Sequence, residues 1–381
     1  MANGDKLDRR YRTTPDGKPT SRIVGEIKRP DERCHGFARA ATGEFGPEIQ
    51  RLRAIFVAKY PNGAALNWSI KAALKGNEDG PVSQRRIETK DVPRATQHIK
   101  DLARFYRADA VGVCELTSFA VYSHSAETGE PIELSHRYAI AILVDQDYRT
   151  MCGSTGMDMI SSAQSLIAYS HSGFIAIQIA EYIRSLGYAA RAHFPGVYQV
   201  AIPPILLYAG LGEISRAGIV LHPELGMRFK AAAVTTDFPL IPDKPIDFGL
   251  QSFCEKCKKC ARYCPSQSIS HGGKGVYNGY ETWITDYAGC TKFRIGNKAG
   301  SSCGRCIKVC PWNRRDSWYH RMAMAAAERS GLAQQGLIKI DEMLRSNLRV
   351  EPGDRWWRIE DFATLPEGGF VSQEHSLIGT P

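Results

Sequence analysis

The 381-residue chain has no long hydrophobic run. No segment approaches the roughly 18 consecutive apolar residues of a membrane-spanning helix, so we expect a chain that does not span a membrane. The start of the chain is polar, and the Arg9-Arg10 pair is not followed by an apolar stretch, so neither a secretory nor a twin-arginine signal is visible. We therefore expect a cytoplasmic protein. The alternative is an exported, membrane-associated protein whose twin-arginine signal was removed from this numbering.

Three common cofactor motifs are also missing. The chain has no Gly-x-Gly-x-x-Gly opening a helix after a strand, so a Rossmann nicotinamide site is not expected. It lacks the phosphate-binding loop of ATPases, and it lacks the Cys-x-x-Cys-His of covalently attached haem. The net charge of +9 suits an acidic partner or a negatively charged substrate. The basic residues are dispersed, however, so we expect no nucleic-acid partner.

Cysteine, by contrast, is abundant. Eight of the eleven cysteines lie between Cys254 and Cys310. A disulfide framework is typical of a small secreted chain with little core, whereas this chain is long and 43% hydrophobic. Closely spaced cysteines in such a chain indicate a metal site.

The spacing of these cysteines is that of a bacterial ferredoxin. The first motif is Cys254-x2-Cys257-x2-Cys260-x3-Cys264-Pro265. Cysteines at this spacing converge on one iron–sulfur cluster, while the cysteine before proline binds the other cluster. The second motif ends in the same rhythm, but its first cysteine is set back: Cys290-x12-Cys303-x2-Cys306-x3-Cys310-Pro311.

The crossed pattern predicts two [4Fe–4S] clusters. One is assigned to Cys254, Cys257, Cys260 and Cys310, and the other to Cys264, Cys290, Cys303 and Cys306. A zinc site is the alternative, but zinc takes four ligands in two pairs and gains nothing from a Cys-Pro at each end. Because clusters transfer single electrons, the long region upstream should hold a redox cofactor or a substrate.

Strand and helix patterns alternate upstream of the cysteines. Helical patterns begin at Pro93 and near Ser161 or Ser172, and the second ends at Gly187. Patterns of buried strands cover 110–114, 138–144 and 229–235. This alternation indicates an α/β or α+β core.

The remaining segments are less regular. We expect an extended arm over 1–50, an apolar run over 197–207 broken by Pro203-Pro204, a loop over 271–280 and helices over 318–348. The irregular tail from Val350 should be packed down by Trp356-Trp357. The expected units are an N-terminal arm and cap (1–94), an α/β core (95–250), a ferredoxin-like domain (251–320) and a C-terminal packing segment (321–381).

A cobalamin whose cobalt takes a histidine would require Asp-x-His-x-x-Gly. Only Arg191-Ala192-His193-Phe194-Pro195-Gly196 comes near, and it lacks the aspartate. A surface or core histidine is therefore the preferred interpretation of His193.

Several motifs stand in a specific order around the cysteines. They are Gly210-Leu211-Gly212-Glu213 with Arg216, then Thr236 to Leu240 and Pro242 to Gly249, and finally Cys310-Pro311-Trp312-Asn313. In this order the chain resembles the cobalamin-dependent reductive dehalogenases over roughly residues 95–320. Epoxyqueuosine reductase, a tRNA-modifying enzyme with a similar Cys-Pro-Trp-Asn ending, is the alternative. The set-back Cys290 and the Trp283 segment before it fit the dehalogenases better.

The resemblance implies an α+β fold with a nitroreductase-like core that binds base-off cobalamin without a protein ligand to cobalt. A separate donor, such as a ferredoxin or a flavodoxin, would supply electrons through the two clusters to form Co(I). The substrate would be an organohalide, whose carbon–halogen bond is replaced by carbon–hydrogen. An electron-carrier subunit without catalysis of its own is a third interpretation.

The reaction needs a proton donor for carbon and a cation for the departing halide. The resemblance implies Tyr169 as the donor and Lys230 as the cation, with Arg228 and Arg294 as further basic candidates. Without the resemblance, the ordinary interpretation of Tyr169 is an amphipathic tyrosine between core and surface, and that of Lys230 is a solvated lysine. Ser172, Gly173, Gly210 and Gly212 are expected to let backbone approach the corrin or its nucleotide tail, although glycines near helix ends often serve only as caps.

Overall fold

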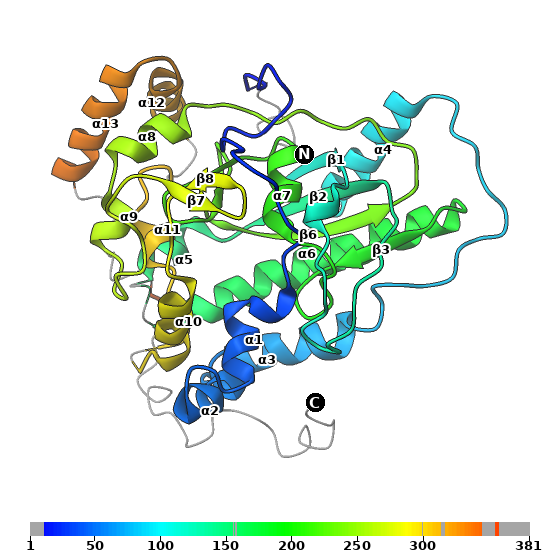
Figure 1. The fold of residues 1–381 in the computed structure, drawn as a ribbon, viewed down its shortest axis with the longest axis horizontal. Helices are drawn as coiled ribbons and strands as arrows, with labels where there is room; N and C mark the ends of the chain where they lie inside the picture. Colours follow the sequence, from blue (N-terminus) through cyan, green and yellow to red (C-terminus); the bar gives the residue numbers. More distant parts are fainter. Residues whose placement is uncertain are drawn as a thin grey trace.

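An antiparallel sheet forms the centre of the protein, as a computed structural model shows. The model describes residues 11–154, 156, 158–298, 300–313, 317–344 and 355–357. The strands are β1 (Ala110–Glu115), β2 (Tyr138–Asp145), β3 (Ala190–His193) and β6 (Phe229–Thr236), in the order β1-β2-β6-β3, and all neighbours are antiparallel (Figure 1). The three predicted strands are present, and the α+β class is confirmed.

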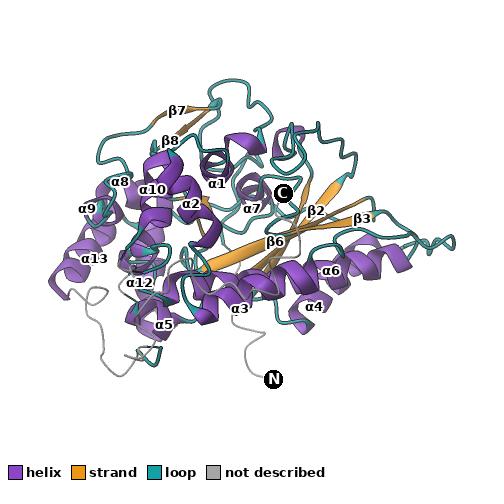
Figure 2. Cartoon of the chain, turned by 90° about the horizontal axis from the view of Figure 1, so that it is seen from below, coloured by secondary structure: helices purple, strands orange, loops and turns teal. Residues whose placement is uncertain are grey.

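Both faces of this sheet are buried. Along β2, Ile140 and Ile142 pack with helix α6 (Ile160–Ser185), whereas Ala141 and Leu143 pack with helix α7 (Ile202–Tyr208) on the other face. Successive side chains of a strand point to opposite faces, so the alternation fixes which residues meet α6. Figure 2 shows α6 running across one face of the sheet beside α4 (Val92–Phe105).

The start of α4 and the end of α6 lie where the sequence indicates them. The side chain of Asp91 caps α4 by accepting a hydrogen bond from the Arg94 amide at 3.0 Å, and Pro93 lies in the first turn. Helix α6 has few charged residues and is buried along most of its length. It ends before Gly187, whose φ of +86° allows the chain to turn back toward β3.

Two sequence-based expectations were wrong. Pro203-Pro204 does not break the apolar run, because the two prolines occupy the first turn of α7, where no helical N–H is required. The segment 271–280 is not only a loop: β7 (Gly275–Tyr277) pairs with β8 (Tyr280–Thr282) in a short hairpin.

The N-terminal region is partly extended and partly helical. Its first described residues run along the surface and form bridges such as Thr13 to Ile246 and Ile23 to Tyr280. The expected arm then gives way to short helices: η2 (Glu32–Cys34), α1 (Gly36–Ala41), α2 (Pro47–Ile55), α3 (Pro61–Ser69) and η3 (Ile70–Leu74).

The cysteine motifs and the C-terminal helices lie at one end of the molecule (Figures 1 and 2). The elements not yet named are η4 (Ser118–Ala120), α5 (Tyr148–Gly153), β4 (Glu213–Ile214), β5 (Val220–Leu221), α8 (Leu250–Lys256), α9 (Lys259–Arg262), α10 (Tyr287–Gly296), α11 (Arg305–Val309), α12 (Trp318–Arg329) and α13 (Gly331–Leu344). Helices α12 and α13 match the predicted helical segment. Most of the expected irregular tail lies outside the described residues, although Trp357 is buried against Ile160. The four unit boundaries stay a prediction.

Among the described residues, no helix is long and apolar enough to cross a membrane.

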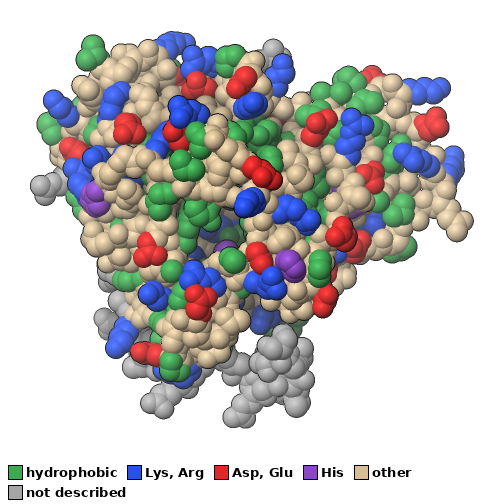
Figure 3. Space-filling model, viewed as in Figure 1, with side chains coloured by type: hydrophobic (Ala, Val, Ile, Leu, Met, Phe, Trp, Pro, Cys, Tyr) green, Lys and Arg blue, Asp and Glu red, His purple; other side chains and the backbone are tan. Residues whose placement is uncertain are grey.

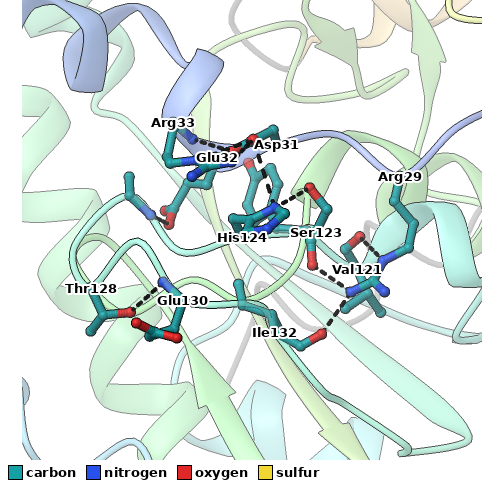
Figure 4. A network of polar contacts seen from close by, with 12 residues as sticks. Arg29, Asp31, Glu32, Arg33, Val121, Ser123, His124, Thr128, Glu130 and Ile132 are labelled. Carbon is teal, nitrogen blue, oxygen red and sulfur yellow. Dashed lines mark hydrogen bonds and ion pairs between the residues drawn. The ribbon is translucent and has the colours of Figure 1, made fainter.

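Arg29 connects the N-terminal region to the loop that precedes β2. Its guanidinium donates to the carbonyl oxygens of Val121 (3.3 Å), Tyr122 (2.7 Å) and Ile132 (2.7 Å), as Figure 4 shows. The Ser123 amide also donates to Pro30 O at 2.8 Å. One cation thus holds both ends of the 121–132 loop.

We expect Arg29→Met to open the 121–132 loop. Loss of the three hydrogen bonds leaves their carbonyls to water, and amides of this loop should exchange hydrogen about tenfold faster. Arg22→Met is the matched control, because Arg22 makes only an exposed ion pair with Glu281 at 3.0 Å. Equal exchange rates in the two variants would show that the contacts of Arg29 do not order the loop.

Candidate active site and cluster-binding site

Short helices bring the cysteines of the two motifs together. In the first motif, Cys254 lies on α8 and Cys260 on α9; in the second, Cys306 lies on α11. Helices α9 and α11 pack against each other, so the similar halves of the two motifs face one another. The set-back Cys290 lies on α10, in the insertion that precedes the second half.

One group of thiols joins the two motifs. Burial raises the pKa of the Cys310 thiol well above its ordinary value, and the neighbouring thiols of Cys254, Cys257 and Cys260 raise it further. Burial also raises the pKa of Cys260 to about 12. The last cysteine of the second motif therefore lies with the first three of the first motif, as the crossed assignment requires.

The other group of thiols combines the last cysteine of the first motif with the first three cysteines of the second motif. Burial raises the pKa of the Cys290 thiol, and the charges of Cys303 and Cys264 raise it further. For the Cys306 thiol, burial is again the largest cause of a raised pKa, followed by Cys303 and then Cys260, Cys290 and Cys264. The contribution of Cys260 shows that the two groups are neighbours.

This donor set fits iron–sulfur clusters. Buried thiols with raised pKa values need metal to become thiolates, and the amide of Arg305 also donates to the Cys303 sulfur at 3.5 Å. In the described part of the chain, no three His, Cys, Asp or Glu side chains gather closely enough to hold one metal ion. Two wider groups of four thiols suit clusters better than a mononuclear zinc site.

A buried lysine fixes the helix that carries Cys290. The ammonium of Lys59 donates to the carbonyl of Asn297 at 2.7 Å and to those of Ile295 and Gly300 at 3.4 Å. These carbonyls lie at the end of α10 and just beyond it, where a helix leaves acceptors without partners. The cap therefore connects the N-terminal helices to the insertion.

The structure brings Tyr169 and Lys230 together. Tyr169 lies in the first half of α6, and Lys230 lies near the start of β6 on the face that α6 covers. The Lys230 Nζ atom is 5.2 Å from the centre of the Tyr169 ring. Within the described residues, neither the Lys230 ammonium nor the Tyr169 hydroxyl has a hydrogen-bond or ion-pair partner.

Two further tyrosines, Tyr198 and Tyr122, and the carboxylate of Glu32 lie near this pair, and no periodic pattern in the sequence indicates them. Burial raises the pKa of Tyr198, and the charges of Tyr169, Tyr122 and Glu32 raise it further. The Tyr198 hydroxyl donates to the carbonyl of Ala231, next to Lys230, at 3.1 Å. The Tyr122 amide donates to Gln199 O at 2.9 Å, which places it beside the Tyr198 segment.

The two arginine candidates have partners within the chain. Arg228 is buried and makes a two-pronged ion pair with Asp145, with both distances 2.9 Å. It also donates to Asn313 Oδ1 at 2.7 Å, so it joins the sheet to the end of the second cysteine motif. Arg294 donates to Ser302 Oγ at 3.2 Å and lies 4.7 Å from the centre of the Phe37 ring, close to the second cysteine group.

The residues expected to approach the corrin have packing roles within the chain. The Ser172 hydroxyl donates to Tyr169 O at 3.1 Å. A Cβ on Gly173 would lie 3.2 Å from atoms of Leu74 and Phe194. Gly210 has a φ of +69°, and a Cβ there would lie 2.5 Å from the carbonyl oxygen of Lys244. At Gly212 the obstacle would be the carbonyl oxygen of Leu221, at 2.3 Å.

We expect Gly210→Ala to destabilise the protein even without any added corrinoid. The new methyl group meets a backbone carbonyl, and the positive φ adds strain, for a combined loss of about 2 kcal/mol or more. Gly129→Ala is the control, because Gly129 has a φ of +77° but nothing lies within 4 Å of its added Cβ. Thermal unfolding followed by circular dichroism should show the larger fall for Gly210→Ala; equal falls would contradict a packing role.

His193 is a core histidine. Its Nε2 lies 2.8 Å from Thr235 Oγ1, and its Nδ1 accepts a hydrogen bond from the Gln199 amide at 3.2 Å. Burial lowers the pKa of its imidazole well below the ordinary value. Both ring nitrogens are used by the chain, so this histidine is not available as a ligand to cobalt.

These features define a class: an α+β core with a polar site between α6 and β6, joined to a ferredoxin-like segment with two cysteine groups. Residues 253–314 match the family model of a 4Fe-4S dicluster domain.

The curated relatives agree with this description. The chain is 30% identical over 299 residues to the tetrachloroethene reductive dehalogenase of Sulfurospirillum multivorans, over 68% of this chain and 59% of that protein. Its identity to the tetrachloroethene reductive dehalogenase of Desulfitobacterium hafniense (strain Y51) is 36% over 246 residues, which cover 60% of this chain and 43% of that protein. The epoxyqueuosine reductase of Aliivibrio fischeri is 28% identical over 173 residues, 43% of each chain.

Solved structures are similar as well. A reductive dehalogenase that suggested a mechanism for B12-dependent dehalogenation gives a TM-score of 0.88 at 36% identity, over 94% of this chain and 52% of that chain. A catabolic reductive dehalogenase in complex with 3-bromo-4-hydroxybenzoic acid gives a TM-score of 0.84 at 37% identity, over 88% of this chain and 49% of that chain. The chain spans about half the length of these relatives. The predicted resemblance to reductive dehalogenases is confirmed in sequence and in fold.

Proposed function

We propose that this chain is a corrinoid-dependent reductive dehalogenase, an oxidoreductase that replaces carbon–halogen with carbon–hydrogen. The observation that carries the proposal is the Lys230 ammonium over the Tyr169 ring, without an ion-pair partner among the described residues, in a chain that also carries a ferredoxin-like cluster segment. The similarity to proteins named reductive dehalogenases supports the same activity.

The site fits a cofactor rich in amide groups. The hydroxyl of Ser170, next to Tyr169, and the Oε1 atom of Gln146 are buried and have no hydrogen-bond partner in the described chain. The side-chain amide of Gln146 also donates a hydrogen bond to Ser165 Oγ at 3.4 Å, and Ser165 lies one turn before Tyr169 on α6. Cobalamin carries amides around its ring that would satisfy such atoms, and His193, whose ring nitrogens both have partners in the chain, would not be among the residues that hold it.

The side chains divide the remaining work. When bound, cobalamin supplies the low-valent cobalt that delivers two electrons to the carbon–halogen bond. The Tyr169 hydroxyl holds the proton that carbon gains, and the Lys230 ammonium stabilises the negative charge of the departing halide and of the tyrosinate. Tyr122, Tyr198 and Glu32 line the approach and restrict the shape of the substrate. One organohalide, two electrons and one proton thus give the reduced carbon and a halide ion.

The face of the molecule seen in Figure 3 is hollowed near its middle. Basic and acidic side chains are interspersed around the hollow. We infer that electrons enter from a separate ferredoxin or flavodoxin through the cysteine segment, and that the protein is cytoplasmic, with the exported form as the alternative.

The ligand assignment of Cys290 is tested by Cys290→Ala. One cluster should be lost or altered while the other keeps its signal in electron paramagnetic resonance, and iron should fall from about eight toward about half of that per chain. Cys34→Ala is the control, because Cys34 is an exposed cysteine outside both groups. Iron content equal to wild type in Cys290→Ala would remove Cys290 from the ligand set.

The role of Tyr169 is tested by Tyr169→Phe in protein loaded with corrinoid and both clusters. Turnover should fall by about a hundredfold or more, while the optical spectra of corrinoid and clusters stay as in wild type. Tyr277→Phe, at an exposed tyrosine on β7, should keep full turnover. An unchanged rate in Tyr169→Phe would exclude Tyr169 as the proton donor.

The substrate panel for that assay should include 3-bromo-4-hydroxybenzoic acid, tetrachloroethene and a transfer RNA that carries epoxyqueuosine. Release of halide from either organohalide, with deuterium from heavy water at the reduced carbon, is the expected result. Reduction of the modified transfer RNA with no halide release would instead establish the epoxyqueuosine reductase alternative.

A further inference from the structure

Arg216 is a buried cation beside the first cysteine group, and the reaction chemistry above does not use it. It lies in the turn between β4 and β5, and its side chain is fully buried. The guanidinium donates to Cys254 O (2.9 Å), Ser270 O (2.9 Å) and Gly272 O (2.8 Å), with a longer contact to Glu255 O (3.3 Å). All four acceptors are neutral carbonyls.

The same residue also acts on the sulfur atoms. Burial raises the pKa values of the Cys254 and Cys260 thiols, and the positive charge of Arg216 acts on both in the opposite direction. The guanidinium lies 4.9 Å from the centre of the Trp283 ring, which packs it in place. Arg216 is therefore rigidly held, because a planar guanidinium with several carbonyl partners has little freedom left.

No carboxylate neutralises Arg216 within the part of the chain that the structure describes. The nearest acidic residue along the chain, Glu213, instead accepts from Thr20 Oγ1 and from the amides of Phe248 and Leu250. Lys259 differs from Arg216: its charge reaches Cys257, but it is paired with Asp341. A buried cation without a counter-ion needs a negative group nearby, and a thiolate-bound cluster supplies one.

We propose that Arg216 tunes the cluster held by Cys254, Cys257, Cys260 and Cys310 by raising its reduction potential. When this cluster takes one electron from a low-potential donor, no bond forms or breaks, and the cluster becomes more negative by one charge. A fixed positive charge in a buried setting stabilises the reduced form more than the oxidised form. Arg216 is thus a positioning and tuning residue. The inference rests on the two-cluster assignment and not on the organohalide reaction.

The test is a redox titration with dithionite, followed by electron paramagnetic resonance, on the full chain with both clusters. In Arg216→Met the equilibrium constant for reducing this cluster should fall about tenfold, which is about 59 mV for a one-electron couple. The signal is assigned by its change in Cys257→Ser. Arg216→Gln, which keeps a hydrogen-bond donor but no charge, should shift the potential in the same direction, and Arg216→Lys should restore most of it.

Lys274→Met is the matched control. The Lys274 ammonium lies 4.6 Å from the centre of the same Trp283 ring but donates to Gln251 Oε1, at 2.8 Å, and not to a cluster loop carbonyl. Its removal should leave the potential unchanged.

Iron content is measured first, so that two kinds of failure are separated. Wild-type protein without about eight iron atoms per chain would refute the two-cluster assignment itself. Unchanged potentials in Arg216→Met and Arg216→Gln with full iron would overturn the tuning role. Loss of iron from both neutral variants would also overturn it, in favour of a purely structural role for Arg216.

Discussion

Burial of both faces of the four-stranded sheet is the constraint on which the site depends. Residues of β6 alternate between two hydrophobic cores, so Ala232 and Val234 face α6 while Ala231 and Ala233 face away. Lys230 has the parity of the α6 face and must therefore point toward that helix. A shift of one residue in strand pairing would remove its ammonium from Tyr169 and place it against α7.

Cations bound to carbonyls join this sheet to the cysteine segment. Arg228 connects Asp145 at the end of β2 with Asn313 after the second motif, and Lys59 caps the helix that carries Cys290. Lys308, between two cysteines of the second motif, is buried and donates to Ser154 O, and burial lowers its pKa to about 8. Buried cations of this kind stabilise negatively charged thiolates nearby.

Residues of the N-terminal region contact the cysteine segment and lie near the tyrosines around Lys230. Arg216 donates to the carbonyls of Cys254, in the first cysteine group, and of Ser270, while Arg294, on the helix of Cys290, lies against Phe37 of the N-terminal helices. Burial raises the pKa values of Tyr122 and Tyr198, and the charge of Glu32, from the same N-terminal region, raises both further. A region without a recognisable motif therefore contributes to the surroundings of these tyrosines and of the second cysteine group.

The sequence by itself determined the local elements and the cluster chemistry. The strands, the two long helices and the crossed cysteine pattern depend on apolar periodicity, caps and spacing, which are local signals. The prolines in the first turn of α7 and the β7–β8 hairpin were misjudged. A proline suits a first helical turn as well as a break, and a short hairpin has no long periodic pattern.

The tertiary structure alone decided which side chains meet. It placed Lys230 over Tyr169, committed Arg228 to Asp145, used both nitrogens of His193, and gave Gly210 a close carbonyl neighbour. It also showed Tyr122, Tyr198 and Arg216 in positions that no spacing indicates. Contacts between residues far apart in the chain depend on sheet register and helix packing, and these are settled only when the whole core is buried.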